Sequence, residues 1–215
     1  AFWIHGTLKV RLEAFNFIPD LIISDFEPIG ISLAKVLNKP CIVVFGYDPD
    51  LYKTYLKRHK VSISMKVEST YFSKLYDQAT HVIIPSLRNP EKKHLRYSYI
   101  SPILREEINN LPKDNEIMKG LGLKKKPILI SLGGSNFGHK LVKGLNKVAH
   151  KFKEDFIVFG GDLDFPLAKN IQYISFTDEL LKYLKVAKGV ITLGGQQTLA
   201  EALAFKKPIL CYPIQ

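Results

Sequence analysis

A glycine pair followed by polar residues at helical spacing is the feature of this sequence best suited to chemistry. Gly194 and Gly195 end the apolar run 190–193, and Thr198 and Glu201 then lie three positions apart on a predicted helix. Helical side chains lean toward the helix N-terminus, so both can reach a ligand at the strand end. Thr198 could hold a phosphate oxygen, and the Glu201 carboxylate could accept both hydroxyls of a ribose. Alternatively, Glu201 is only a favourable charge in the first turns of a helix.

A second glycine pair lies earlier in the chain. Gly133 and Gly134 follow the apolar run 128–132 and precede a helix predicted from about His139. Glycines let the backbone approach a ligand closely, and free N–H groups at a helix N-terminus suit a phosphate. A tight turn with no ligand explains this pair equally well. Ligands of parallel α/β sheets bind at the carboxyl ends of the strands, where both pairs are predicted.

Short runs rich in valine and isoleucine alternate with helical patterns along the chain. This alternation predicts an α/β fold with parallel strands, several of them buried on both faces. The predicted strands are residues 21–25, 41–45, 81–85, 127–132, 156–159, 171–174, 189–193 and 208–212. The predicted helices are residues 8–17, 29–37, 67–77, 139–153, 178–186 and 196–205.

A polar stretch with proline, glycine and lysine separates two series of these elements. We therefore predict two Rossmann-like halves: an N-terminal, acceptor-side domain over 1–104 and a C-terminal, donor-binding domain over 127–215. Residues 105–126 are predicted to be a linker carrying a short helix. Both halves are expected to be incomplete in this chain, because a helix leads into the first strand and the last strand has no helix to cover it.

Composition narrows the class of protein. Apolar residues make up 46% of the chain, enough for a core, and no apolar stretch reaches the ~18 residues that span a bilayer. The formal charge of +11 comes from lysines spread along the chain without a nucleic-acid-binding signature, so we expect no nucleic-acid partner. Cys41 and Cys211 lie in apolar runs and are predicted to be core residues in a reducing compartment. The sequence contains no cluster of Asp and His residues, so we predict no metal site.

The second glycine motif resembles a known signature. The pattern Gly194-Gly195-x-x-Thr198-x-x-Glu201-Ala202-Leu203, followed by Lys207-Pro208, is similar to the donor site of GT-B glycosyltransferases. The resemblance is to the family 28 group, which includes the N-acetylglucosaminyltransferase of lipid II and the plastid galactolipid synthases, and to an archaeal-type branch. Residues 19–28 resemble the N-terminal half of that branch, and residues 102–105 resemble its interdomain passage.

The resemblance implies a role for each matching residue. It implies that Glu201 binds the ribose hydroxyls and that Phe176 lies beside the uracil, whose edge is read by backbone groups. Thr177 is a candidate N-cap of the next helix as well as a ligand contact. The other implied donor-binding residues, mostly facing the diphosphate, are Gly133, Gly134, Ser135, Gly194, Gly195, Gln197 and Thr198.

The sequence also departs from the family pattern. Leu193 stands where many relatives have histidine before the glycine pair. The segment that reads the sugar hydroxyls is expected to follow Gln215, and the acceptor loop with the catalytic base is expected to precede residue 1. The catalytic residue is therefore unassigned, with Asp25 as a weak acceptor-side candidate at a strand end. Alternatively, Asp25 caps the helix that begins near Pro28.

Two further features have structural and functional explanations. His5 and His81 have no partners at a telling spacing and are predicted to be structural. The segment 47–66 interleaves aromatic residues with Lys53, Lys57, Arg58, His59 and Lys60. A basic face of this kind suits an anionic membrane surface or a lipid-phosphate acceptor. A solvated helix face explains it equally well.

Together these features predict an inverting, metal-independent hexosyltransferase. It would move a hexose or N-acetylhexosamine from a UDP-sugar, its substrate, to an acceptor hydroxyl, with no cofactor. The alternatives are a nucleotide-sugar hydrolase or epimerase of the same fold, or the donor-binding subunit of a split glycosyltransferase with a second subunit. The expected location is the cytoplasm, with peripheral attachment to the inner face of the membrane.

Overall fold

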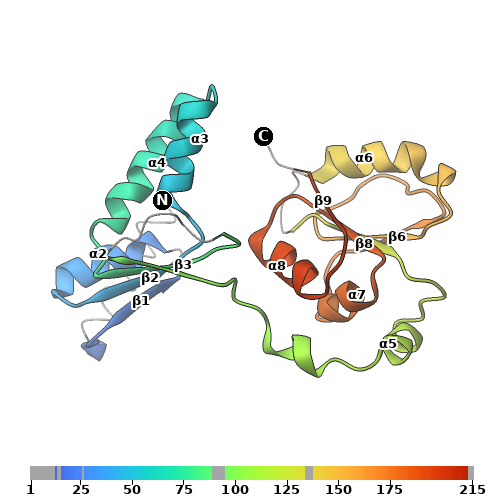
Figure 1. Cartoon of the computed structure of the whole chain (residues 1–215), viewed down its shortest axis with the longest axis horizontal. Helices are drawn as coiled ribbons and strands as arrows, with labels where there is room; N and C mark the ends of the chain where they lie inside the picture. The colour runs from blue at the N-terminus through green and yellow to red at the C-terminus, as the bar shows by residue number, and fades with distance from the viewer. Residues whose placement is uncertain (1–12, 14–15, 26, 89–94, 134–137, 213–215) are drawn as a thin grey trace. The chain divides into compact units, whose positions relative to one another are not determined.

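The chain forms two compact units, each an α/β structure on a parallel sheet (Figure 1). The computed structural model describes residues 13, 16–25, 27–88, 95–133 and 138–212. The units are Ala1–Ser101 and Pro102–Gln215, so the boundary lies close to the predicted one at residue 104. The predicted fold class is confirmed. The predicted helix over 8–17 falls almost entirely outside the described residues.

The first unit has a four-stranded sheet in the order β1-β2-β3-β4, with every neighbouring pair parallel. Its strands are β1 (Ile22–Asp25), β2 (Cys41–Val44), β3 (His81–Pro85) and β4 (Tyr97–Ile100). Its helices are α2 (Pro28–Leu37), α3 (Pro49–Arg58) and α4 (Ile63–Tyr76). Neither β4 nor α3 was predicted, because β4 is a short polar-aromatic strand and α3 buries only Pro49.

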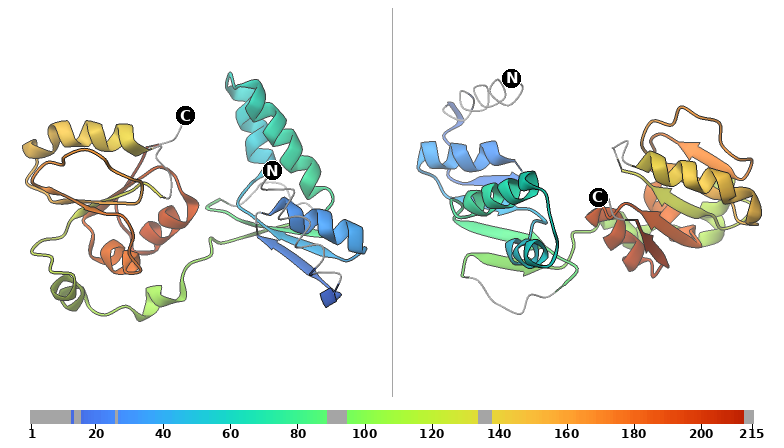
Figure 2. Two further views of the ribbon diagram at one scale, coloured as in Figure 1. Left: turned by 180° about the vertical axis from the view of Figure 1, so that it is seen from behind. Right: turned by 90° about the horizontal axis from the view of Figure 1, so that it is seen from above.

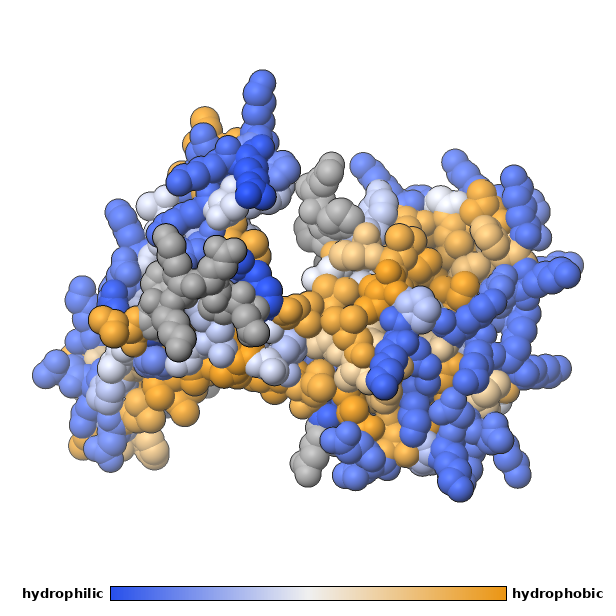
Figure 3. Space-filling view, in the orientation of Figure 1, coloured by the Kyte–Doolittle hydropathy of each residue, from blue (hydrophilic) through white to orange (hydrophobic). Residues whose placement is uncertain are grey.

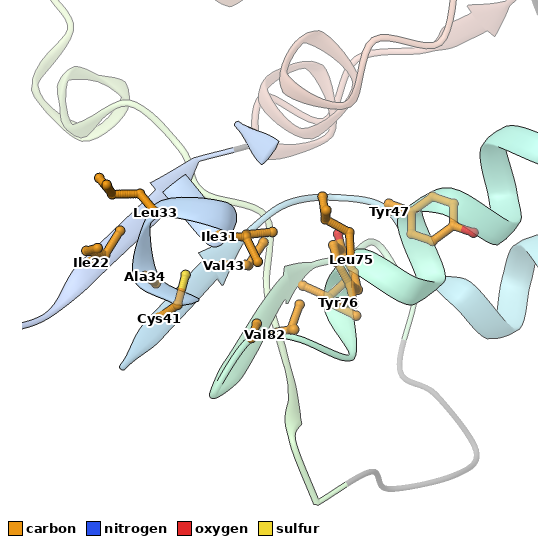
Figure 4. Close-up of a cluster of buried hydrophobic side chains, with 12 residues drawn as sticks. Ile22, Ile31, Leu33, Ala34, Cys41, Val43, Tyr47, Leu75, Tyr76 and Val82 are labelled. Atoms are coloured by element: carbon orange, nitrogen blue, oxygen red, sulfur yellow. The ribbon is translucent and has the colours of Figure 1, made fainter. Parts of the chain in front are cut away.

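The core of this unit lies on one face of its sheet. Ile22, Val43 and Val82 are buried there with Ile31 of α2 and Tyr76 of α4 (Figure 4). Successive strand residues point to opposite faces, and each of β1–β3 alternates buried with more exposed positions. Within the described residues, burial on both faces is therefore a property of the second unit and not of this one.

A buried carboxylate that the sequence did not single out starts α3. Asp48 is the N-cap and accepts from the amides of Asp50 and Leu51, both at 3.0 Å. Arg88 donates to the other oxygen, Oδ2, at 2.9 Å, and the Tyr99 hydroxyl donates to Oδ1 at 3.3 Å. Burial favours the protonated form, but the bonds from Leu51 and Arg88 outweigh it, so the pKa of Asp48 lies below its ordinary value. Asp48 thus ties α3 to the carboxyl ends of β2–β4.

The second unit has five strands in the order β7-β6-β5-β8-β9, with every neighbouring pair parallel. Figure 2 draws this unit from two further sides. These are β5 (Ile128–Ser131), β6 (Phe156–Phe159), β7 (Ile171–Ile174), β8 (Gly189–Thr192) and β9 (Ile209–Cys211). The helices are α5 (Asp114–Gly120), α6 (His139–Val148), α7 (Leu180–Val186) and α8 (Gln196–Ala204). Among the described residues of this unit, short 3₁₀ helices also lie at Glu106–Asn110 and Ala149–Lys151.

Both faces of this sheet are covered. Leu129 and Ile157 point to the side on which α7 and α8 pack, and the next residues, Ile130 and Val158, point to the side of α6. All four side chains are buried, as expected of strands that read as continuous apolar runs. Leu193, the residue before the glycine pair Gly194-Gly195, is buried in the α6-side core.

Residues 105–126, predicted as a linker, pack on the second unit. Ile108, Leu111, Leu121 and Leu123 lie against its α7- and α8-side core. The Lys185 ammonium donates to two carbonyls of the same segment, those of Leu111 at 3.0 Å and Pro112 at 2.7 Å. The segment therefore belongs structurally to the second unit.

The two cysteines differ in their surroundings. Cys41 is buried in the first core, as predicted, and burial raises the pKa of its thiol. Cys211 is exposed, so its prediction as a core residue is wrong. It lies on β9, which pairs only with β8 among the described strands and therefore leaves its side chain less covered.

Candidate functional site

The strand order of the second unit creates a topological switch point beside its central strand. Strand β5 lies at the centre; the chain proceeds from it to β6 and β7 on one side and to β8 and β9 on the other. Loops after β5 and β8 therefore leave the sheet in opposite directions, and ligands of such folds bind at this switch point. Both glycine pairs follow these two strands.

The pair after β8 shapes the start of α8. Gly194 has a φ of 96°, in the region that favours glycine, and a β-carbon there would lie 3.4 Å from the Cys211 sulfur. Gly195 is the N-cap of α8 and makes no side-chain capping bond. The positive end of the α8 dipole therefore lies beside the strand end with no acidic residue in its first turn.

A pocket of about 660 Å³ opens at the carboxyl ends of β5, β6 and β7. Its volume is within the usual range of small-molecule sites, ~300–1,000 Å³. Arg105 is its single cationic lining residue and Asp162 its single acidic one within the described part of the chain. The full lining is Arg105, Ser131, Gly133, Phe159, Gly160, Gly161, Asp162, Ser175, Phe176, Thr177 and Leu180.

A third glycine pair, missed by the sequence reasoning, forms one wall of this pocket. Gly160 and Gly161 follow β6, with φ values of 77° and 71°. A β-carbon on Gly160 would lie 2.1 Å from the Gly133 carbonyl oxygen, and the Gly161 amide donates to the same oxygen at 3.2 Å. The Tyr173 hydroxyl donates to the Gly161 carbonyl at 2.6 Å. The sequence could have indicated this pair, because Gly160 and Gly161 follow the predicted strand 156–159 just as the other two pairs follow theirs.

The Glu201 carboxylate is buried and fully engaged. Its side chain is 1% exposed, yet Arg105 donates to both oxygens, through Nε and Nη2, each at 2.7 Å. The Gln197 amide, one helical turn away, also donates to Oε1 at 2.7 Å. Two parallel charge-assisted bonds of this kind are strong and directional. Gln197, predicted to contact a diphosphate, is thus a partner of Glu201 in this structure.

The other predicted contacts lie around the same edge of the sheet. Thr198 Oγ1 lies 3.4 Å from Oγ of Ser131, the last residue of β5 and part of the pocket wall. Phe176 lines the pocket and is 79% exposed. Thr177 accepts from the Glu179 amide at 3.0 Å, but the N-cap position of α7 is Glu179 itself.

Several predicted residues are not brought into this pocket by the structure. Gly134 and Ser135 lie outside the described residues. Asp25 ends β1 in the first unit, and its acceptor-side role stays a prediction. The alternative that Asp25 caps α2 is wrong, because Glu27 is the N-cap and accepts from the Ile29 amide at 3.3 Å. His81, predicted to be structural, lies with its Nε2 atom 2.8 Å from the Ser98 hydroxyl.

The described residues contain no group of three or more His, Cys, Asp or Glu side chains placed to hold a metal ion. Among the helices described, none combines the length and the apolar character needed to cross a membrane.

Comparison with known families gives a match along nearly the whole chain. The family described as Glycosyl transferase family 1 matches residues 5–215. An uncharacterized glycosyltransferase of Methanosarcina mazei is 25% identical over 234 residues, covering 98% of this chain and 58% of the relative. A Clostridium botulinum UDP-N-acetylglucosamine–N-acetylmuramyl-(pentapeptide) pyrophosphoryl-undecaprenol N-acetylglucosamine transferase is 35% identical over 224 residues, covering 98% of this chain. This chain spans 58% of the length of that relative as well.

Solved structures show the same fold. Phytolacca americana UGT2, complexed with UDP-2-fluoro-glucose and pterostilbene, is similar with a TM-score of 0.66 at 13% identity. The similarity covers 99% of this chain and 61% of that one. A UDP-glucosyltransferase from Polygonum tinctorium has the same TM-score, 0.66, and covers 98% of this chain and 62% of its own. The fold is that of GT-B glycosyltransferases.

Proposed function

Because this chain belongs to glycosyl transferase family 1, we propose that it acts as a hexosyltransferase that uses a UDP-sugar. The observation that carries the proposal is the pocket at the carboxyl ends of β5–β7, with Glu201 and its partners at its edge. The Clostridium relative and the solved Polygonum structure, both named for UDP-sugars, support the choice of nucleotide. The donor would occupy the second unit.

Each part of a UDP-sugar has a matching group in this unit. The exposed ring of Phe176 would stack on the uracil, since every base offers an aromatic face. The Glu201 carboxylate would accept from the ribose hydroxyls. The diphosphate would lie toward Gly133 and the N-terminus of α8, where closely approaching backbone and the helix dipole favour a negative charge.

The reaction we propose is a single displacement with inversion. The acceptor hydroxyl would lose its proton to a base and form a bond to the anomeric carbon. The bond from that carbon to the diphosphate oxygen would break at the same time, and UDP would leave with the electron pair. Glycine-loop amides and the α8 dipole would stabilise the charge that develops on the diphosphate, without an assigned metal ion. The base remains unassigned.

A calorimetric screen tests this assignment. We expect UDP to bind with a Kd at least about tenfold lower than that of GDP, TDP or ADP, because the pocket must hold the uracil edge specifically. A donor screen should then identify one UDP-sugar that is consumed with an acceptor present. Release of free sugar without any acceptor would support a hydrolase instead. Absence of binding by every nucleotide would refute the function.

The acceptor, we propose, is lipid-linked and reached at an anionic membrane surface. The Clostridium relative is named for a pyrophosphoryl-undecaprenol substrate. On α4, Ile63, Val67 and Tyr71 are exposed and lie along one face of the helix, with Lys66 and Lys74 on the same face. Figure 3 shows single apolar side chains among hydrophilic ones over the outer part of the α3–α4 pair. Apolar side chains ringed by lysines suit insertion between anionic headgroups.

Charge reversal on this face of α4 tests whether the face contributes to membrane binding. The double variant Lys66→Glu/Lys74→Glu is expected to bind vesicles of 30% phosphatidylserine at least about tenfold more weakly, since each lysine near such a surface contributes ~1 kcal/mol. The matched control reverses two exposed lysines in the last turns of α5 and α6, Lys119 and Lys147. Equal loss in both double variants, or none in either, would contradict a membrane face on α4.

A further inference from the structure

The pairing of Glu201 conflicts with the role that the donor would give it. A carboxylate offers about four lone-pair positions. In this structure three hydrogen bonds already use them, two from Arg105 and one from Gln197. A ribose diol brings two more donors. The carboxylate cannot take both hydroxyls while it keeps all three present partners.

Arg105 is the partner most able to leave. Gln197 is on the same helix as Glu201, one turn away, and can stay beside it. Arg105 comes from the segment that follows Ser101, and its side chain is 37% exposed on the pocket wall. It therefore has a path from the buried carboxylate into the pocket.

The pocket also offers Arg105 a second anion. It is the one cationic residue of the described lining, and the diphosphate of a bound donor would need a positive partner. A guanidinium forms the same two parallel bonds with a phosphate as with a carboxylate. Moving from one to the other leaves neither charge buried alone.

We propose that Arg105 is an exchange residue of the donor site. Without a donor it occupies both oxygens of Glu201, so that the carboxylate is not available to the ribose hydroxyls. On donor binding it passes to the diphosphate, and Glu201 turns its freed oxygens to the ribose hydroxyls. Binding of the nucleoside part is thereby made dependent on the diphosphate. This inference rests on the proposed function, because it assumes a ribose diphosphate in this pocket.

The test compares UDP with uridine, which has the diol and no phosphate. In Arg105→Ala nothing competes for Glu201, so uridine affinity is expected to rise several-fold. The diphosphate loses its partner, so the ratio of UDP affinity to uridine affinity should fall at least about tenfold. If Arg105 merely positioned Glu201, both ligands would weaken by the same factor. Uridine affinity that does not rise, or an unchanged ratio, overturns the exchange.

A second variant and a measurement on the unaltered protein test the proposal even if Arg105→Ala does not fold. Arg105→Lys keeps the positive charge but loses the two-pronged guanidinium. Uridine affinity should therefore rise less than in Arg105→Ala, while the ratio of UDP affinity to uridine affinity stays near that of the unaltered protein. In the unaltered protein the Arg105 Nε–H resonance, assigned by its loss in Arg105→Lys, should shift on saturation with UDP. A resonance that does not move overturns the proposal. Arg96→Ala, which removes an exposed arginine paired with Asp77, is the control and should change neither affinity.

The outcomes separate this inference from the proposed function. If the unaltered protein binds no uridine nucleotide, both fall. If it binds UDP but the affinity ratio survives in Arg105→Ala, the donor site stands and only the exchange is refuted.

Discussion

Replacing Glu201 with Gln is expected to remove the preference of this protein for ribonucleotides. Hydrogen bonds to a charged acceptor contribute ~1.5–3 kcal/mol, so UDP should bind about 10- to 100-fold more weakly. The unaltered protein should favour UDP over 2′-deoxy-UDP, and the variant should bind the two alike. Calorimetry with both nucleotides measures this difference directly.

The same substitution should also destabilise the second unit. It leaves Arg105 without its carboxylate, and breaking a buried pair costs ~3–5 kcal/mol; we expect the lower end because Arg105 is 37% exposed. Asp114→Asn is the matched control, since it removes an exposed ion pair with Lys126 that contributes under ~1 kcal/mol. Retained discrimination between UDP and 2′-deoxy-UDP in a folded Glu201→Gln protein would exclude Glu201 from the ribose site.

Gly160→Ala is expected to be the most damaging single-methyl change in the pocket. The new β-carbon would lie 2.1 Å from the Gly133 carbonyl oxygen, which is backbone and cannot rotate away. The φ of 77° adds strain for any residue with a side chain. We expect a loss of ~3 kcal/mol or more in the free energy of unfolding, measured by urea titration, together with loss of UDP binding.

Gly144→Ala is the control for this variant. Gly144 lies within α6, and a β-carbon there would meet nothing within 4 Å. Alanine in a helix interior should raise the free energy of unfolding by ~0.5–1 kcal/mol and leave nucleotide binding unchanged. A Gly160→Ala protein as stable as this control would show that the two loops do not need their close contact.

Short sequence patterns predict most of the strands of this chain correctly. Five of the eight predicted strands differ from the observed ones by only one or two terminal residues, and His81–Pro85, Phe156–Phe159 and Ile171–Ile174 agree fully. The apolar runs made this possible, because a buried parallel strand must be apolar whatever its neighbours are. The elements that were missed, α3 and β4, are those whose side chains are mostly not buried. Periodicity is weakest where burial is partial.

The glycine pair after β8 and Glu201 were recognisable from residue types and spacing, since a strand, a turn and a helix are local events. The partners of that carboxylate were not. Arg105 lies 96 positions from Glu201 in the sequence and meets it only because the segment after Ser101 packs on the second unit. Likewise Gly160 meets Gly133 only because β6 pairs with β5. Strand ends, turn glycines and the spacing of Thr198 and Glu201 are properties of short segments, so the residue order is enough to predict them. Which charges neutralise one another depends on the folded chain, because a buried ion pair requires closeness in space and not along the chain.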